Sequence, residues 1–247
     1  MSGLLYFHQG WTDIINCLPL INIYAKRYPM LYVVVREDAD LLIRFYLRGL
    51  KNVMPLFYPK KSLDTLGWAS LVNLKALGIK NYELIGDFDV GRIDNYKGQY
   101  GRIRDSGLDI PFEELFYTAY DIPYSSRISE FVLYRNPDVE GEVYDKIVKN
   151  EPYICTHTNK GLNLYVNPDP SYNIIELDTT TYRFFDMIRV LQHAKAIHVI
   201  DSVWGAVCYM IDAKYGLLEN VPVYVYCHRD FHRMFTNPKN LPNWKMV

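Results

Sequence analysis

The chain opens with two short hydrophobic runs separated by an amphipathic stretch. Residues 4–8 form the first run, and residues 31–35, rich in β-branched valine, form the second. Between them, hydrophobic residues recur at helical spacing. We therefore predict a helix that has Asp13 as its N-cap, kinks at Pro19 and ends near Tyr28. Strand, helix and strand in this order are typical of a βαβ unit and of a parallel sheet.

The same patterns continue to the end of the chain. They predict helices at residues 39–50, 65–77, 111–120, 139–149, 182–193 and 203–214. They predict strands at residues 53–58, 82–85, 131–134, 153–157, 174–177, 196–200 and 221–226, with a hairpin arm at 162–166. A turn near residue 136 separates two α/β series, 1–135 and 136–247. Trp244 predicts that the irregular tail packs back onto the chain. The predicted fold class is α/β.

Composition narrows the class of protein. The 247 residues are 49% hydrophobic and 22% charged, with a net charge of -1, which excludes wholesale disorder and a strongly basic nucleic-acid binder. No stretch reaches the roughly 18 apolar residues that span a bilayer, and the N-terminus lacks the pattern of a signal peptide. We expect a soluble, cytoplasmic protein with no membrane span and no nucleic-acid partner. The cysteines form no C-x-x-C pair, so we expect them to be buried and free, with no metal site.

The clearest local motif is a predicted strand that ends in Asp201-Ser202 and leads directly into a helix beginning at Val203. The first-turn N–H groups of such a helix have no partner within it, and its dipole is positive there. The motif therefore predicts an anion site suited to a pyrophosphate, with Asp201 accepting sugar hydroxyls. Helix capping alone by Asp201 or Ser202 explains the motif equally well.

A second motif is the polar tip of the predicted strand at residues 153–157. Thr156, His157, Thr158 and Lys160 follow an apolar run there. Ligands of parallel sheets gather at the carboxyl ends of the strands, so this tip and Asp201 are expected at one edge. His157 and Lys160 are candidates for binding phosphate oxygens.

A third motif is the first strand-to-helix turn, which contains Gly10 and Asp13. Gly10 would allow the backbone to approach a ligand closely, and Asp13 is a candidate general base for an attacking hydroxyl. An ordinary N-cap is the alternative role of Asp13. The dinucleotide fingerprint G-x-G-x-x-G is absent.

Residues 10–20 resemble the opening of the ADP-heptose:lipopolysaccharide heptosyltransferases, in which a glycine–aspartate turn is followed six residues later by Leu-Pro-Ala-Leu. The spacing from Asp13 to Pro19 is kept, but Trp11 and Thr12 separate Gly10 from Asp13. Residues 185–217 resemble the donor side of that family. The segments 116–117, 122–127, 131–135, 185–188 and 228–245 also resemble small, uncharacterised glycosyltransferases of bacteria and large DNA viruses.

These resemblances imply a GT-B fold, with two Rossmann-like halves facing a cleft, and an inverting, metal-independent glycosyltransferase of glycan biosynthesis. Residues 1–135 would be the acceptor side and residues 136–247 the donor side. Asp13 would be the base, with a nucleotide-diphosphate sugar, UDP-linked by preference, as donor and a saccharide as acceptor. The implied donor-binding residues are Gly10, Thr156, His157, Thr158, Lys160, Asp178, Asp201, Ser202 and Val203. Arg127 and Arg135 could neutralise the diphosphate, or form structural ion pairs instead.

Two other functions stay open at this stage. Asp87 and Asp89 form a D-x-D sequence that could hold a divalent metal in a GT-A glycosyltransferase. The second α/β series after residue 150 fits that fold poorly. The other alternative is a non-catalytic protein that binds sugar nucleotides or glycans.

Overall fold

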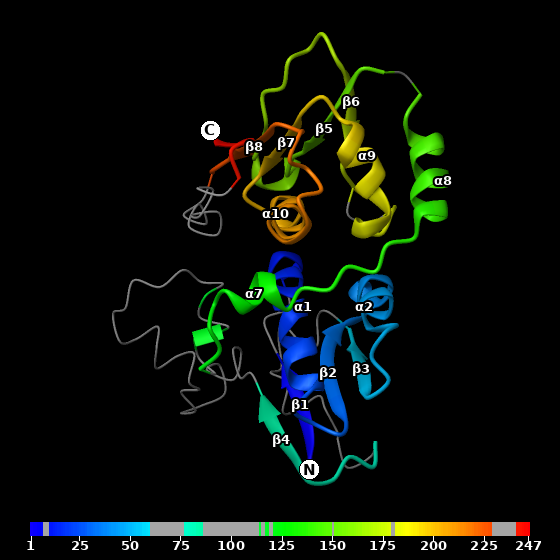
Figure 1. Cartoon of the computed structure of the whole chain (residues 1–247), viewed down its shortest axis with the longest axis vertical. Helices are drawn as coiled ribbons and strands as arrows, with labels where there is room; N and C mark the ends of the chain where they lie inside the picture. The colour runs from blue at the N-terminus through cyan, green and yellow to red at the C-terminus, as the bar shows by residue number, and fades with distance from the viewer. Residues whose placement is uncertain are drawn as a thin grey trace. The chain divides into compact units, whose positions relative to one another are not determined.

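The computed structural model describes residues 1–6, 10–59, 77–85, 114, 117–118, 121–149, 151–178, 181–228 and 241–247. The chain divides into two units, Met1–Val132 and Leu133–Val247, and each is described by itself (Figure 1). From the sequence we predict this division between residues 135 and 136, three residues further along. The predicted helices at 65–77 and 111–120 lie wholly or mostly outside the described residues, as do Asp87 and Asp89.

The first unit is built on a 4-stranded parallel sheet with the order β3-β2-β1-β4. Its elements are β1 (Ser2–Tyr6), α1 (Trp11–Ala25), β2 (Leu31–Arg36), the 3-10 turn η1 (Glu37–Ala39), α2 (Asp40–Leu47), β3 (Val53–Tyr58), β4 (Tyr82–Ile85) and α7 (Ser126–Ser129). The predicted βαβ opening is confirmed. The strand predicted at residues 53–58 has the observed bounds of β3.

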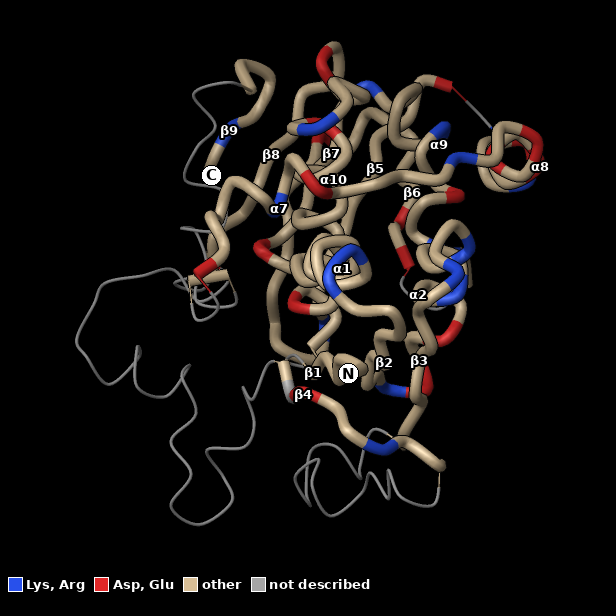
Figure 2. Tube along the Cα trace, turned by 60° about the horizontal axis from the view of Figure 1, so that its bottom comes forward, with Lys and Arg blue, Asp and Glu red and all other residues tan. Residues whose placement is uncertain are grey.

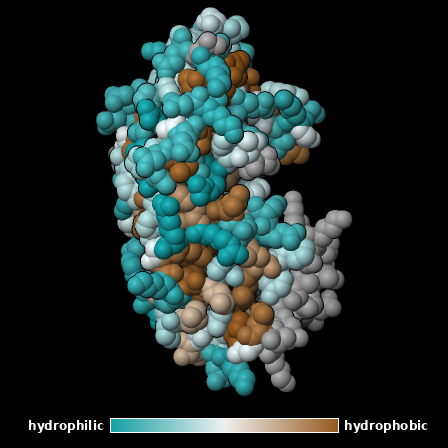
Figure 3. Space-filling model, turned by 90° about the vertical axis from the view of Figure 1, so that its right-hand side faces the viewer, coloured by the Kyte–Doolittle hydropathy of each residue, from teal (hydrophilic) through white to brown (hydrophobic). Residues whose placement is uncertain are grey.

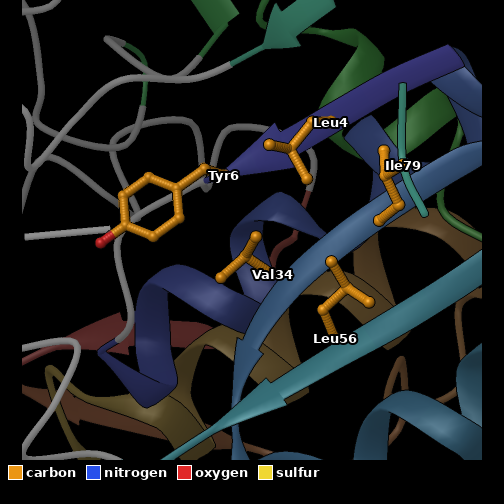
Figure 4. Packing of buried hydrophobic residues seen from close by; sticks show 5 residues of the cluster. All are labelled: Leu4, Tyr6, Val34, Leu56 and Ile79. Carbon is orange, nitrogen blue, oxygen red and sulfur yellow. The ribbon is translucent and has the colours of Figure 1, made fainter. Parts of the chain in front are cut away.

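Buried side chains from β1, β2 and β3, together with Ile79 before β4, form a hydrophobic cluster in this unit. Figure 4 shows them packed together: Leu4, Tyr6, Val34, Leu56 and Ile79. Burial of such large apolar side chains stabilises the unit by about 1.5–3 kcal/mol per fully buried residue.

Helix α1 begins earlier than the sequence pattern predicts. Gly10 is its N-cap and supplies no side-chain hydrogen bond, so the prediction that Asp13 caps the helix was wrong. Asp13 is instead the third helical residue, where its carboxylate interacts favourably with the positive end of the helix dipole. The helix continues through Pro19. The Tyr117 hydroxyl donates to the backbone oxygen of Asn16 (2.6 Å), next to the turn where Pro19 offers no N–H.

The second unit contains a 5-stranded parallel sheet with the order β6-β5-β7-β8-β9. Its elements are α8 (Pro137–Ile147), β5 (Tyr153–His157), the 3-10 turn η3 (Lys160–Leu162), β6 (Asn173–Glu176), the 3-10 turn η4 (Phe184–Met187), α9 (Ile188–His193), β7 (Ile197–Ile200), α10 (Val203–Tyr215), β8 (Val223–Tyr226) and β9 (Trp244–Met246). Asn136 caps α8 by accepting from Val139 N–H, with Pro137 at the first helical position.

Three predicted elements of this region differ from the structure. Residues 131–134 form no strand, and residues 162–166 form no hairpin arm beyond a single bridge between Asn159 and Leu164. The tail, predicted to be irregular, pairs with β8 as strand β9. Asp212 explains this pairing, because its buried carboxylate accepts the indole N–H of Trp244 (2.8 Å) and the backbone N–H of Leu218 (2.8 Å).

Figure 2 shows Lys and Arg interspersed with Asp and Glu along both units. On the face in Figure 3, hydrophilic side chains cover most of the surface and hydrophobic ones form small, separate patches. Among the described residues, no helix is both long and apolar enough to cross a bilayer. Cys17, Cys155 and Cys208 are buried and free, as predicted, whereas Cys227 is free but only partly buried.

Candidate functional site

The candidate site lies at the carboxyl edge of the second sheet. β5, β7 and β8 are parallel neighbours, so their last residues reach the same edge. His157 of β5 pairs in register with Val199, and Ile200 pairs with Tyr226 of β8. Asp201 follows directly after β7 and is fully buried. Its backbone N–H donates to the carbonyl oxygen of Tyr226 (3.1 Å), which fixes the end of β7 against β8.

The N-terminus of α10 is capped without a side chain. Ser202 is the N-cap in extended conformation, and its hydroxyl makes no capping bond. Within the described part of the chain, two buried polar atoms here have no hydrogen-bond partner, the Ser202 Oγ and the indole Nε1 of Trp204. Buried polar groups are nearly always hydrogen-bonded, so a pair of exceptions at one helix N-terminus points to a bound group. For Ser202, simple capping is therefore not the explanation.

His157 is held in one orientation at the end of β5. Its Nδ1 lies 2.9 Å from the carbonyl oxygen of Leu177, just after β6. Burial lowers the pKa of the His157 imidazole, against smaller opposing effects of the Leu177 carbonyl, Glu176 and Asp178. The predicted role of His157 as a phosphate-binding cation therefore finds little support in its environment.

The other predicted residues of this tip have different surroundings. Thr156 is buried within β5. The Thr158 hydroxyl donates to Glu176 (3.3 Å), and the exposed Lys160 ammonium lies 3.5 Å from the same carboxylate. Asp178 is exposed and accepts from the Thr181 hydroxyl. Lys160 is thus an exposed cation whose ion pair with Glu176 is weak, because both side chains face solvent.

Sequence reasoning missed the residues that fasten the loop after β5 to the sheet. The imidazole of His198 contacts the Tyr226 hydroxyl through Nδ1 (3.0 Å), and that hydroxyl donates to the carbonyl of Asn167 (3.1 Å). His228 contacts the carbonyl of Tyr165 through Nε2 (2.7 Å). The spacing of Tyr224 and Tyr226 on alternate positions of one strand was the available signal, because polar-tipped residues there lie on one face.

The first unit has a second group of polar side chains, at the start of α1 and the end of β2. Asp13 is 8% exposed in the first turn of α1. Gly10 has φ -63° and ψ 145°, a conformation open to any residue, so its backbone does not require glycine. The Arg36 guanidinium lies over the ring of Trp11 (5.3 Å to the centroid) and pairs with Asp38. Trp11 and the buried Arg36 thus form a cation–π pair at the start of α1.

The two candidate diphosphate arginines are both engaged within their own units. Arg127 is buried, and its guanidinium donates to the Tyr124 hydroxyl (2.6 Å) and the side chain of Asn16 (3.2 Å). Arg135 donates from Nε to the buried carboxylate of Glu140 (3.0 Å), and its Nη2 donates a second hydrogen bond to the same carboxylate. Both environments favour the structural alternative. Among the described residues, no three His, Cys, Asp or Glu side chains gather as a metal site would require.

Comparison with known proteins bears on the fold. No protein-family model matches the sequence. No curated protein matches it either. Among solved structures, the ADP-heptose LPS heptosyltransferase II of E. coli is similar over 100% of this chain and 90% of its own, with 13% identity and a TM-score of 0.55. A family 9 glycosyltransferase from Veillonella parvula is similar over 100% and 86%, with 8% identity and a TM-score of 0.59. The predicted α/β fold of the GT-B type and the resemblance to heptosyltransferases are confirmed at the level of fold.

Proposed function

We propose that this protein is a GT-B glycosyltransferase that moves a sugar from a nucleotide-diphosphate donor to a saccharide acceptor. The observation that carries the proposal is the N-terminus of α10, where Ser202 Oγ and Trp204 Nε1 are buried without partners. The fold likeness to a heptosyltransferase and a family 9 glycosyltransferase supports it. In this proposal the diphosphate accepts hydrogen bonds from these groups, because a hydroxyl and an indole N–H can each donate to an anion.

In this proposal the donor binds at the carboxyl edge of the second unit. The first-turn N–H groups of α10, starting at Val203, and the helix dipole stabilise the diphosphate without any metal. Lys160 can leave its weak ion pair with Glu176 and add a positive charge. Asp201, at the end of β7, is the proposed acceptor of hydroxyl groups of the sugar. The same contacts stabilise the charge that develops on the leaving diphosphate.

Asp13 is the proposed general base. Its carboxylate removes the proton from the acceptor hydroxyl as the hydroxyl oxygen bonds to the anomeric carbon of the donor sugar. The bond from that carbon to the diphosphate oxygen breaks at the same time, and its electron pair leaves with the nucleoside diphosphate. Attack from the face opposite the leaving group inverts the anomeric centre.

A binding experiment with different sugar nucleotides would identify the donor nucleotide. UDP-sugars are our first choice, and the E. coli heptosyltransferase is named for an ADP-linked sugar. Calorimetric titration with UDP-glucose, GDP-mannose, ADP-glucose and dTDP-glucose, first without metal and then with manganese, separates the possibilities. We expect metal-free, saturable binding of one nucleotide class, weakened by Ser202→Ala and unchanged by Arg44→Gln, a change in an exposed ion pair of α2.

The other outcomes contradict this proposal in distinct ways. Binding that requires manganese and is lost with Asp89→Ala favours the GT-A alternative. Donor binding without transfer to any saccharide, and without donor hydrolysis, favours a non-catalytic binding protein. No binding to any of the donors removes the basis for a glycosyltransferase.

A further inference from the structure

The His157 ring is fixed in a single tautomer by the fold. Its Nδ1 lies 2.9 Å from the backbone oxygen of Leu177, and a carbonyl oxygen can only accept a hydrogen bond. The proton of the neutral imidazole therefore belongs to Nδ1. Nε2 on the other side of the ring then carries a lone pair and acts as a hydrogen-bond acceptor.

The charges around His157 leave the ring neutral. Glu176 and Asp178 are the acidic groups that favour protonation, but burial outweighs them and lowers the pKa of the imidazole below its usual 6.5. The Glu176 carboxylate is shared with the Lys160 ammonium and the Thr158 hydroxyl, which reduces its effect on the ring.

The position of His157 places this acceptor at the proposed donor edge. His157 ends β5 and pairs in register with Val199 of β7, two residues before Asp201. A phosphate oxygen, itself an acceptor, gains nothing from a bare Nε2. A sugar or ribose hydroxyl, which can donate, fits it.

We propose that His157 accepts a hydrogen bond through Nε2 from a hydroxyl group of the donor, on the ribose or on the transferred sugar, and does not bind the diphosphate. This proposal rests on the proposed function. His157 thus distinguishes donors by their hydroxyl pattern, while Lys160 and the α10 N-terminus hold the charge. It is a specificity residue, separate from the base.

A spectroscopic test examines the ring without any ligand. Nitrogen-15 NMR of histidine-labelled protein reports the tautomer and protonation of each ring, with the His157 signal assigned by its loss in His157→Asn. We expect a neutral ring protonated on Nδ1 at pH 7. A ring protonated on Nε2, or positively charged at pH 7, overturns the proposal whatever the protein binds.

A binding test examines the hydroxyl. His157→Asn retains an amide for the Leu177 carbonyl but removes the distal acceptor, and we expect donor affinity to fall roughly three- to tenfold. A 2′-deoxyribose donor and donors deoxygenated on the sugar are titrated against both proteins. The analogue that lacks the recognised hydroxyl should bind wild type roughly three- to tenfold more weakly than the intact donor does. His157→Asn should bind this analogue and the intact donor with equal affinity. His193→Asn is the matched control, because His193 Nδ1 also contacts a carbonyl oxygen (Arg189, 2.9 Å), but at an exposed position of α9.

The outcomes separate this inference from the proposed function. If each deoxy donor loses as much affinity for His157→Asn as for wild type, the proposed role of His157 is overturned. The glycosyltransferase proposal then stays intact. Affinity that rises from pH 7.5 to pH 5.5, and does so only with His157 present, also overturns it, because a cation on the diphosphate would behave that way. No donor binding by wild type contradicts both.

Discussion

Asp212 accepts a hydrogen bond from the indole N–H of Trp244 at 2.8 Å, and this bond ties α10 to the last strand of the second sheet. The same carboxylate receives the backbone N–H of Leu218 (2.8 Å) and the amide of Asn243 (3.3 Å). A buried carboxylate with three donors holds three segments together: the end of α10, the following turn and β9.

Removal of the indole donor should destabilise the second unit. Trp244→Phe deletes one charge-assisted hydrogen bond and leaves part of a buried carboxylate unpaired, at an expected cost of about 1.5–3 kcal/mol in the free energy of unfolding. Urea denaturation measures this change. Arg44→Gln, which removes an exposed i,i+4 ion pair with Asp40, should cost about 0.3–0.5 kcal/mol in the same assay. Equal losses in the two variants would mean that the Asp212–Trp244 hydrogen bond stabilises the protein no more than an exposed ion pair does.

Trp204→Phe should separate ligand binding from stability. The wild-type indole N–H is buried without a partner in the described structure, so its loss removes a penalty that offsets the cost of the cavity left by the smaller phenyl ring. We expect the free energy of unfolding without ligand to change by less than about 1 kcal/mol, and donor affinity to fall roughly three- to tenfold. Thermal unfolding with and without donor measures both quantities. A large loss of stability without ligand, with unchanged affinity, would assign the indole to packing alone.

Arg135→Gln distinguishes the two roles assigned to this arginine. The bidentate pair with the buried Glu140 predicts a loss of about 1.5–3 kcal/mol in the free energy of unfolding, at the lower end because Arg135 is partly exposed. Donor affinity measured by calorimetry should stay within about twofold of wild type. If donor affinity falls while the free energy of unfolding is unchanged, Arg135 binds the diphosphate instead.

Asp13→Asn tests the base directly. The amide keeps the size and hydrogen-bonding capacity of the side chain in the first turn of α1 but cannot accept a proton. Transfer should fall by about 10²–10⁴-fold, with donor affinity nearly unchanged. The loss of a favourable charge at the helix N-terminus should cost only about 0.3–1 kcal/mol of stability. Turnover at the wild-type rate would exclude Asp13 as the base.

The stability of the second unit should decline in mild acid. Burial lowers the pKa of both His157 and His198 below the usual 6.5, so the unfolded chain binds protons first as the pH falls. The stabilisation is complete above pH 6.5 and is lost as the pH falls from there toward the lowered pKa values. Urea denaturation at pH 7.5 and 5.5 measures the loss. His198→Phe, which can keep the stacking on Tyr224 (4.6 Å between ring centroids), should reduce this pH dependence.

The sequence predicts the elements that depend on local patterns. The strands at 53–58 and 153–157 have the predicted bounds, because each is an apolar run with turn residues on both sides. Asp201-Ser202 before α10 was likewise visible in the sequence. In contrast, the start of α1 at Trp11 was missed, because glycine gives no side-chain signal as an N-cap.

The contacts that define the candidate site come from distant parts of the chain. The tautomer of His157 depends on Leu177, twenty positions further along, and the burial of Arg127 depends on Asn16, at a separation of 111. Strand β9 follows from Asp212 in a helix far from it in sequence. Periodicity reports which face of an element is buried, but it does not report the neighbour that meets it.

The register of the first sheet also constrains how the chain can be made. β1 lies between β2 and β4, and its Ser2 to Leu5 pair with Tyr82 to Ile85. A nascent chain leaving the ribosome therefore carries β1 with one open edge until residue 85 has emerged, which takes several seconds at about 5–20 residues per second. An open hydrophobic edge is a template for pairing with other chains. This interval of synthesis is where we expect the protein to depend most on chaperones.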